Sequence, residues 1–271
     1  MEILIAGVGS MGKTYADSFL QSQAITKDDL LLLEHSDEKA DMLRQAGFPH
    51  VIQQADASVS AVRLLILAVK PQDTASLYAQ LRPWLKPEQL VLSIMAGVQL
   101  FTLQQALGIS KIIRAMPNLP AQIGMGMTAF TADASVSRQE LLYVHNLLNT
   151  TGKSLYFDEE HKLDAVTAIS GSGPAYVYYF MDAMMQAAKQ MGFSHTEAEL
   201  LVTQTFMGAV HLENRSSLSC QEWIGRVASK GGTTEAALKS FEADALRQSI
   251  IEGLEEARKR AQVLGGIIPK G

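Results

Sequence analysis

The sequence predicts an α/β fold, in which a doubly wound, mostly parallel sheet is followed by an all-helical C-terminal domain. Up to about residue 157, short apolar runs alternate with amphipathic segments, a pattern typical of a parallel sheet covered by helices on both faces. The first run passes directly into a glycine-rich turn at residues 7–12. Beyond it, after about residue 158, long helix-forming segments rich in Ala, Met, Leu and Glu replace the strand-like runs. We therefore expect two domains, residues 1–158 and 159–271, divided at an acidic stretch.

Seven strands are expected in the first domain, with helices between most of them. The apolar runs that would form them are residues 2–6, 30–34, 64–68, 90–94, 111–115, 128–131 and 154–157. In an open parallel sheet, ligands bind beyond the carboxyl ends of the strands. The residues that follow these runs are therefore the first candidates for a site.

The glycine turn at residues 7–12 has the order of strand, turn and helix start that a dinucleotide-binding unit needs. Gly7 would allow a tight reversal, Gly9 would let the backbone approach a pyrophosphate, and Gly12 would let the helix lie close to the strand. The amides at the helix N-terminus would then be available to phosphates. The alternative is a turn that merely joins a strand to a helix.

The second apolar run ends at Glu34, about 20 residues beyond the glycine turn, where a ribose-binding carboxylate is expected. Such a carboxylate would accept a hydrogen bond from a free 2′-hydroxyl and would repel a 2′-phosphate. The expected cofactor is NADH or NADPH, with NADH preferred.

Three other strand ends would extend this candidate site. Lys70 would place a cation beside the cofactor, the small residues 95–97 would let a nicotinamide ribose come close, and two prolines would fix a turn that presents Asn118. A solvated loop lysine and a purely structural turn are the alternatives. The expected cofactor-binding residues are Gly7, Gly9, Ser10, Met11, Gly12, Glu34, Ala68, Val69, Lys70, Pro71, Met95, Ala96, Gly97 and Asn118.

A second glycine turn, at residues 229–234, precedes another helix-forming stretch. The backbone amides of Gly232, Thr233 and Thr234 could converge on a carboxylate at the positive end of that helix, and Ser229 could add a hydroxyl. An ordinary capped helix is the alternative. One turn suited to phosphate and one suited to carboxylate indicate a dinucleotide held against a small organic acid, and hence hydride transfer.

The absence of a proton-donating side chain restricts the kind of bond that could accept the hydride. No lysine follows Gly171 at the short helical spacing expected of the proton donor in a hydroxyacid dehydrogenase. A protonated imine needs less help, because hydride addition removes its positive charge and a hydroxyl such as that of Thr234 can hold the nitrogen. Reduction of a C=N bond is therefore favoured, and no metal is expected because the histidines lack metal-ligand spacing.

Composition limits the partners and the compartment. A net charge of −5 without a basic run argues against nucleic acid, and no apolar stretch is long enough for a membrane span. Cys220 is the only cysteine, which suits a reducing compartment, and we expect the cytoplasm. The segment 175–191 is apolar on almost every side and is expected in a dimer core. The stretch 265–271 has no assignable role and is expected to be a loose tail or a remnant of cloning.

Over nearly its whole length, the chain closely resembles the pyrroline-5-carboxylate reductase family. The motifs that carry the resemblance are residues 7–12, 68–72, 116–118, 164–176 and 229–234. The resemblance implies a Rossmann domain and a helical domain that intertwines with a partner, so that dimers or rings of dimers are expected. It also implies hydride transfer from NAD(P)H to the C=N bond of 1-pyrroline-5-carboxylate, which gives L-proline.

The resemblance assigns roles to the second glycine turn. Gly231, Gly232, Thr233 and Thr234 would bind the substrate carboxylate; Thr234 would also contact the ring nitrogen, and Ser229 would line the same pocket, which makes these two the expected catalytic residues. Many relatives carry small polar or basic residues where this chain has Glu34, which again favours NADH. A reductase of another cyclic imine, a β-hydroxyacid dehydrogenase relative and a non-catalytic nucleotide-binding regulator are the alternatives.

Overall fold

The computed structural model describes residues 1–265, and the chain divides into two compact units. In this described part of the chain, one unit contains residues 1–172 and 257–265, and the other contains residues 173–256. The boundary that the sequence indicates, between residues 158 and 159, remains a prediction for the functional domains. Apart from Gly265, the expected tail at 265–271 lies outside the described residues.

Within the described residues, the first unit is built on one eight-stranded sheet in the order β3-β2-β1-β4-β5-β6-β7-β8. Only the β6–β7 pair is antiparallel, and the other neighbours are parallel. The strands are β1 Ile3–Ala6, β2 Leu30–Leu33, β3 Val51–Ile52, β4 Leu64–Leu67, β5 Leu90–Ser93, β6 Ile112–Met116, β7 Gly126–Ala132 and β8 Gly152–Tyr156. The predicted fold class and the seven predicted strands are confirmed. The two-residue β3 was not predicted, because so short a run has no detectable period.

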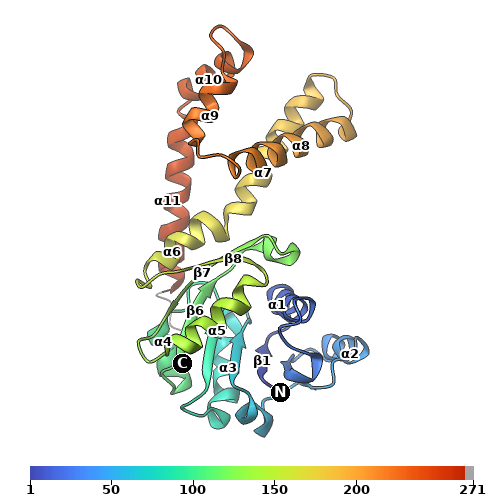
Figure 1. Cartoon of the computed structure of the whole chain (residues 1–271), viewed down its shortest axis with the longest axis vertical. Coiled ribbons are helices and arrows are strands. Elements are labelled where there is room, and N and C mark those ends of the chain that lie inside the picture. The colour runs from blue at the N-terminus through green and yellow to red at the C-terminus, as the bar shows by residue number, and fades with distance from the viewer. Residues whose placement is uncertain (266–271) are drawn as a thin grey trace. The chain divides into compact units, whose positions relative to one another are not determined.

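Helices cover both faces of this sheet (Figure 1). The helices are α1 Ser10–Gln21, α2 Asp37–Gln45, α3 Thr74–Leu81, α4 Leu100–Leu107, α5 Arg138–Asn149 and α6 Lys162–Val166. Alternate residues of β1 point to opposite sides of the sheet, so that Ile3 and Ile5 pack with α1, α2 and α5, whereas Leu4 packs with α3 and α4. The apolar runs of the central strands are buried on both faces, as parallel strands require.

Short turns of other helix types connect these elements. The 3₁₀ turns are Lys27–Asp29, Ala57–Ala61, Pro71–Asp73, Arg82–Trp84 and Leu119–Ile123. A π-helical turn, Thr167–Gly171, follows α6 and belongs to the first unit. The next helix in the sequence, α7, belongs to the second unit. π-Helical turns are rare and are often found at functional sites.

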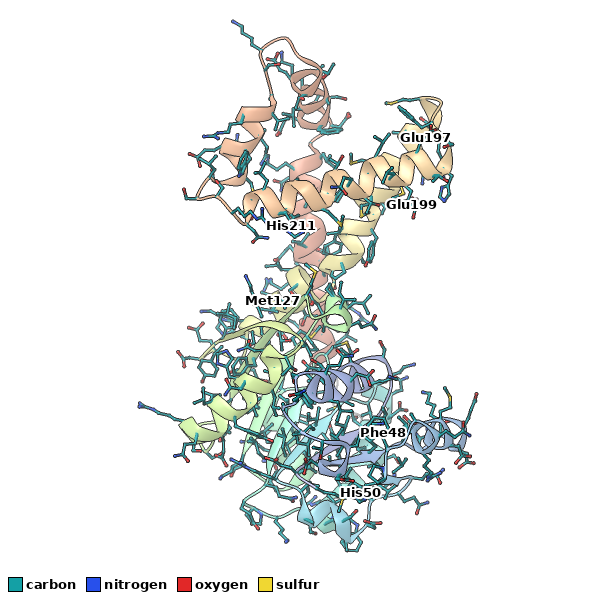
Figure 2. The ribbon with its side chains drawn as sticks, turned by 45° about the vertical axis from the view of Figure 1, so that its right-hand side comes forward. Phe48, His50, Met127, Glu197, Glu199 and His211 are labelled. Atoms are coloured by element: carbon teal, nitrogen blue, oxygen red, sulfur yellow. The ribbon has the colours of Figure 1, made fainter. Side chains whose placement is uncertain are left out.

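The second unit is helical. Its helices are α7 Gly173–Gln190, α8 His195–Glu213, α9 Cys220–Val227, α10 Thr233–Ala243 and the first part of α11 Leu246–Gly265. Both α8 and α9 begin with a capping box, in which Ser194 pairs with Glu197 and Ser219 with Glu222. Figure 2 labels Glu197, with Glu199 and His211, on α8.

Large apolar side chains of α7 are exposed in the single chain. Tyr178 is 58% exposed and Tyr179 is 76% exposed, and no residue of α7 is buried. Met184 on the same helix is also exposed. An apolar surface of this kind marks a site of protein association, which agrees with the expectation that this helix lies in a dimer core.

Candidate functional site

The glycine turn between β1 and α1 packs as tightly as a dinucleotide-binding turn requires. Gly7 has a φ of +89°, and a Cβ atom there would lie 2.7 Å from Val69 Cγ1. A Cβ atom on Gly12 would overlap the Gly7 carbonyl oxygen, so α1 begins in direct backbone contact with the turn. By contrast, a Cβ atom on Gly9 would meet no atom within 4 Å. The turn therefore has no room for a side chain at Gly7 or Gly12, whereas it has free space beside Gly9.

The N-terminus of α1 leaves its first amides without side-chain partners. Gly9 is the N-cap and has no side chain that could accept a hydrogen bond. The amides of Ser10 and Met11 therefore have no hydrogen-bond acceptor in the cap residue's side chain or within the helix. The Ser10 hydroxyl accepts a 2.8 Å hydrogen bond from Gln122 Nε2. Both residues line a cavity of about 490 Å³ along α1.

The strand ends expected to extend the site lie at one edge of the sheet. β1, β4 and β5 are parallel neighbours in register, with Ala6 opposite Leu67 and Leu67 opposite Ser93. The segments 68–71 and 94–97 continue from these last residues at the carboxyl edge. A Cβ atom on Gly12 would lie 3.3 Å from Ala68 Cβ.

Within these segments the residues differ in exposure. Met95 and Gly97 are buried, whereas Lys70 and Ala96 are exposed. Gly97 has a φ of +78°, which favours glycine at that position. The structure thus brings the glycine turn and the segments that follow β4 and β5 together at one edge.

Glu34 braces the glycine turn from the end of β2. Its side chain is only 3% exposed. Oε2 accepts a 3.1 Å hydrogen bond from the Val8 amide, and Oε1 accepts one of the same length from the Ser36 amide. His35 Nδ1 lies 3.4 Å from Oε1. The sequence did not predict that this carboxylate would also hold the turn.

A cavity of about 250 Å³ opens at this edge of the sheet. The residues that line it are Gly7, Leu33, His35, Gln53, Val69, Gln72, Asp73, Ser76, Leu77 and Gln80. None of these lining residues is a lysine or an arginine. The Gln53 amide donates to the Asp37 carboxylate, which adds a further negative charge near the lining.

Asn118 joins two motifs that lie far apart in the sequence. Its Nδ2 donates to both the carbonyl oxygen and the hydroxyl of Ser170, each at 3.2 Å. Its Oδ1 accepts a 2.8 Å hydrogen bond from the amide of Met127, which Figure 2 labels and which lies near the start of β7. Nearby, a Cβ atom on Gly171 would lie 2.5 Å from Met116 Cε.

The role of a buried arginine in β6 was not identified from the sequence. Arg114 is 3% exposed, and its guanidinium lies 3.0 Å from Glu160 Oε1 and 3.1 Å from Asp164 Oδ1. Glu160 Oε1 also accepts a 2.8 Å hydrogen bond from the Leu100 amide at the start of α4. A charged residue inside an apolar strand needs buried partners, and this signal could have identified Arg114.

The second glycine turn forms the N-terminus of α10 in the second unit. Gly232 is the N-cap, so Thr233 and Thr234 are the first two helical residues, whose amides have no acceptor within the helix. Gly232 donates to the Ser229 carbonyl oxygen at 3.0 Å, and a Cβ atom on Gly232 would lie 2.5 Å from Ser229 Oγ. The structure therefore places Ser229, which is exposed, against Gly232 at the start of the helix that contains Thr234.

Glu235 is a further residue of this turn that sequence reasoning missed. Its Oε2 accepts a 2.6 Å hydrogen bond from the amide of Gly231, whose φ is +76°. Its Oε1 lies 3.2 Å from Lys239 Nζ. The Gly231 amide and then the Lys239 ammonium lower the pKa of Glu235 below its ordinary value. The turn thus holds an internal carboxylate beside the expected carboxylate-binding amides.

Two kinds of feature are absent from the described residues. No group of three or more His, Cys, Asp and Glu side chains there could hold a metal ion. In the same part of the chain, no helix has both the length and the apolar character needed to cross a membrane.

Two family models match the chain. Residues 160–264 match the model described as pyrroline-5-carboxylate reductase dimerisation. Residues 2–97 match the model described as NADP oxidoreductase, coenzyme F420-dependent. The two matches fall on the helical and the sheet-forming parts of the chain.

The sequence is similar to that of curated reductases. It is 34% identical to pyrroline-5-carboxylate reductase 2 of Bacillus subtilis over 263 residues, which cover 96% of this chain and 94% of the relative. It is 38% identical to pyrroline-5-carboxylate reductase of Pseudomonas aeruginosa over 215 residues, 79% of each chain.

The fold is similar to that of solved reductases. The Plasmodium falciparum pyrroline carboxylate reductase with NADP bound matches with a TM-score of 0.87 at 26% identity, covering 98% of both chains. The Coxiella burnetii pyrroline-5-carboxylate reductase matches with a TM-score of 0.88 at 29% identity, covering 98% of this chain and 99% of the other.

Proposed function

The chain belongs to the pyrroline-5-carboxylate reductase family, and from this premise we propose how its residues carry out the reaction of the family. That reaction transfers a hydride from NAD(P)H to the C=N bond of 1-pyrroline-5-carboxylate and gives L-proline. The observation that carries the function is the similarity to the Bacillus subtilis reductase over 96% of this chain. The two family models, which match residues 2–97 and 160–264, include both glycine turns.

We propose that the carboxyl edge of the sheet binds the dinucleotide. The open space at Gly9 fits this, because a Cβ atom there would meet no protein atom within 4 Å and a pyrophosphate can approach the backbone. The amides of Ser10 and Met11 would hold the phosphates at the positive end of α1. Segments 68–71 and 95–97 would bracket the nicotinamide half. When bound, the cofactor supplies the hydride.

The turn ahead of α10 is proposed as the substrate site. The amides of Thr233 and Thr234, which have no acceptor within the helix, would hold the substrate carboxylate, because a helix N-terminus favours an anion. The amides of Gly231 and Gly232, which donate to Glu235 and Ser229 in the structure, would join them once those bonds are exchanged for the substrate. The Thr234 hydroxyl would hold the ring nitrogen and so orient the carbon that receives the hydride. Ser229 would line the same pocket. The carboxylate of Glu235, already bonded to the Gly231 amide, supports the ability of this turn to bind such a group.

Turnover by the purified protein tests this assignment. Wild-type protein is expected to oxidise NADH in the presence of pyrroline-5-carboxylate, followed at the cofactor absorbance. Thr234→Ala should lower kcat/KM about tenfold, since a hydrogen bond to a charged group contributes about 1.5 kcal/mol. Thr234→Ser keeps the hydroxyl and is the matched control. Ser229→Ala should have a smaller effect in the same direction.

Three results would contradict the assignment of the reaction, and a fourth would contradict the role of Thr234. Wild-type protein that binds NADH without turnover would favour a nucleotide-binding regulator, and turnover of another imine alone would favour a different cyclic-imine reductase. Turnover of a hydroxyacid with NAD would favour the dehydrogenase alternative. Equal activity of Thr234→Ala and Thr234→Ser would remove the role of the hydroxyl.

We also propose that the protein prefers NADH to NADPH. The Glu34 carboxylate lies at the end of β2, and no lysine or arginine lines the adjoining cavity that would have to receive a 2′-phosphate. The expected kcat/KM is about tenfold higher with NADH, because like charges in a partly buried site repel by more than about 1 kcal/mol. Higher activity with NADPH would refute the preference.

His35→Arg sharpens this test, because it removes no donor from the hydrogen bonds that Glu34 accepts from the Val8 and Ser36 amides. His35 lines the cavity and its side chain is 85% exposed, so an arginine there can reach a 2′-phosphate. The variant should gain about tenfold in kcat/KM with NADPH and change little with NADH. His50→Arg is the control, because His50 immediately precedes β3 and does not line the cavity.

The apolar helices of the second unit are proposed to form a homodimer, from which rings of dimers can be built. The match to a dimerisation model and the exposed side chains of α7 support this. We further propose that the protein works in the cytoplasm, on the basis of its single cysteine. Its proposed partners are the small-molecule substrate and a second copy of the chain, with no nucleic acid or membrane partner.

A further inference from the structure

We infer that Asn118 is a positioning residue, which acts on the reaction by fixing the π-helical turn Thr167–Gly171 against the carboxyl end of β6. The inference rests on the proposed function in one respect, namely that the carboxyl edge of the sheet binds the nicotinamide. The sequence predicts a different role for Asn118, direct contact with the cofactor. Its hydrogen bonds in the structure favour the positioning role.

Both donors of the Asn118 amide are used by one residue. Nδ2 donates to the carbonyl oxygen and to the hydroxyl of Ser170, and Oδ1 accepts from the Met127 amide. The opposite orientation of the amide would set Oδ1 against the Ser170 carbonyl oxygen and Nδ2 against the Met127 amide, both of which repel. The network therefore allows one orientation, with no N–H left over for a ligand.

The π-helical turn needs such support from outside. The Ser172 amide donates to the Thr167 carbonyl oxygen at 2.9 Å, a bond that spans five residues and leaves a wider turn than an α-helix. The Thr167 hydroxyl donates to the Leu163 carbonyl oxygen at 2.8 Å and secures the turn toward α6. Asn118 secures its other end through Ser170.

A packing contact between Gly171 and Met116 lies beside the hydrogen bonds of Asn118 to Ser170, which together we call the clamp. Met116 is the last residue of β6, and its Cε is so close to Gly171 that a Cβ atom there would lie only 2.5 Å away. A side chain at Gly171 would have to displace this methyl group, the flexible end of the Met116 side chain. The turn is thus hydrogen-bonded and packed onto the same strand end.

The location of this clamp connects it to the proposed chemistry. β6 lies beside β5, with Arg114 opposite Ser93, so residues 116–118 and residues 94–97 extend past the same edge of the sheet. Arg114 forms ion pairs with Asp164 of α6 and with Glu160. Glu160 also accepts a hydrogen bond from the Leu100 amide, which follows the segment 95–97 in the sequence. A shift of the turn would therefore be transmitted to the nicotinamide side of the site.

The test compares Asn118→Ala with Ser170→Ala. Asn118→Ala should lower kcat with pyrroline-5-carboxylate about tenfold, since small misplacements in a site cost up to about 100-fold. The Kd for NADH, measured by direct fluorescence titration, should change less than about twofold. The double variant should lose no more than Asn118→Ala alone, because both residues act through one contact.

Hydrogen exchange provides a second readout that needs no substrate. The amides of residues 167–172 should exchange faster in Asn118→Ala, while those of residues 7–12 should not change. Gln104→Ala is the matched control, because its amide also makes two hydrogen bonds, to Ser110 and Asp133, at the opposite edge of the sheet. It should leave kcat and exchange at residues 167–172 unchanged.

Each outcome decides between the two roles of Asn118. A tenfold weaker Kd for NADH with unchanged exchange at residues 167–172 would overturn the inference and restore direct contact with the cofactor. Should Asn118→Ala fail to fold, Asn118→Asp keeps the acceptor for Met127 and removes the donors to Ser170, and it should show the same faster exchange. If the wild-type protein reduces some other substrate, the exchange result still stands.

Discussion

Arg114→Met is expected to lower the free energy of unfolding by about 3–5 kcal/mol, because it leaves the buried carboxylate of Asp164 and the half-buried one of Glu160 without their cation. Arg114 is 3% exposed and pairs with both Glu160 and Asp164, which is itself buried. Methionine fills much of the same volume, so the loss comes from the unpaired charges rather than from a cavity. Glu160 would keep its hydrogen bond from the Leu100 amide but would lose the guanidinium.

Urea denaturation of the variant and the wild type measures this loss. Arg114→Lys keeps a positive charge but cannot reach two carboxylates with a planar fork, so it should lose less than Arg114→Met. Arg44→Met is the matched control, because Arg44 pairs with Asp41 on the exposed surface and should change stability by less than about 1 kcal/mol. A loss in Arg114→Met no larger than in Arg44→Met would show that the buried pairs are not needed.

Gly9→Ala is expected to weaken NADH binding about 100-fold while leaving the folded protein almost as stable as the wild type. The added Cβ atom meets nothing within 4 Å, and the φ of −76° at Gly9 is accessible to alanine. If the turn binds pyrophosphate as proposed, that methyl group occupies the space the phosphates need. Overpacking of this kind costs about 1–3 kcal/mol.

Gly12→Ala separates this effect from a general disturbance of the turn. Its Cβ atom would overlap the Gly7 carbonyl oxygen, so this variant should lose both NADH binding and stability. Titration of each variant with NADH and urea denaturation of each give the two quantities. Tight NADH binding by Gly9→Ala would place the dinucleotide away from this turn and contradict the proposed cofactor site.

The local features of the chain could be predicted from the sequence alone. Each central strand is a continuous apolar run that is buried on both faces, and such a run is visible in a window of a few residues. The glycine turns are equally local, because a positive φ at Gly7 or Gly231 and a helix start nearby depend on adjacent residues. The family was identified from motifs of the same short range.

The partners of the polar side chains were decided by the tertiary structure. Arg114 meets Asp164, and Asn118 meets Ser170, across 50 and 52 residues of sequence. Glu34 is held by the Val8 amide, 26 residues away, so that a residue predicted only for ribose also braces the turn. Buried polar groups must find partners, but only the packed sheet determines which distant groups come within reach. Sequence periodicity therefore predicted the elements, and chain topology chose the contacts that connect them.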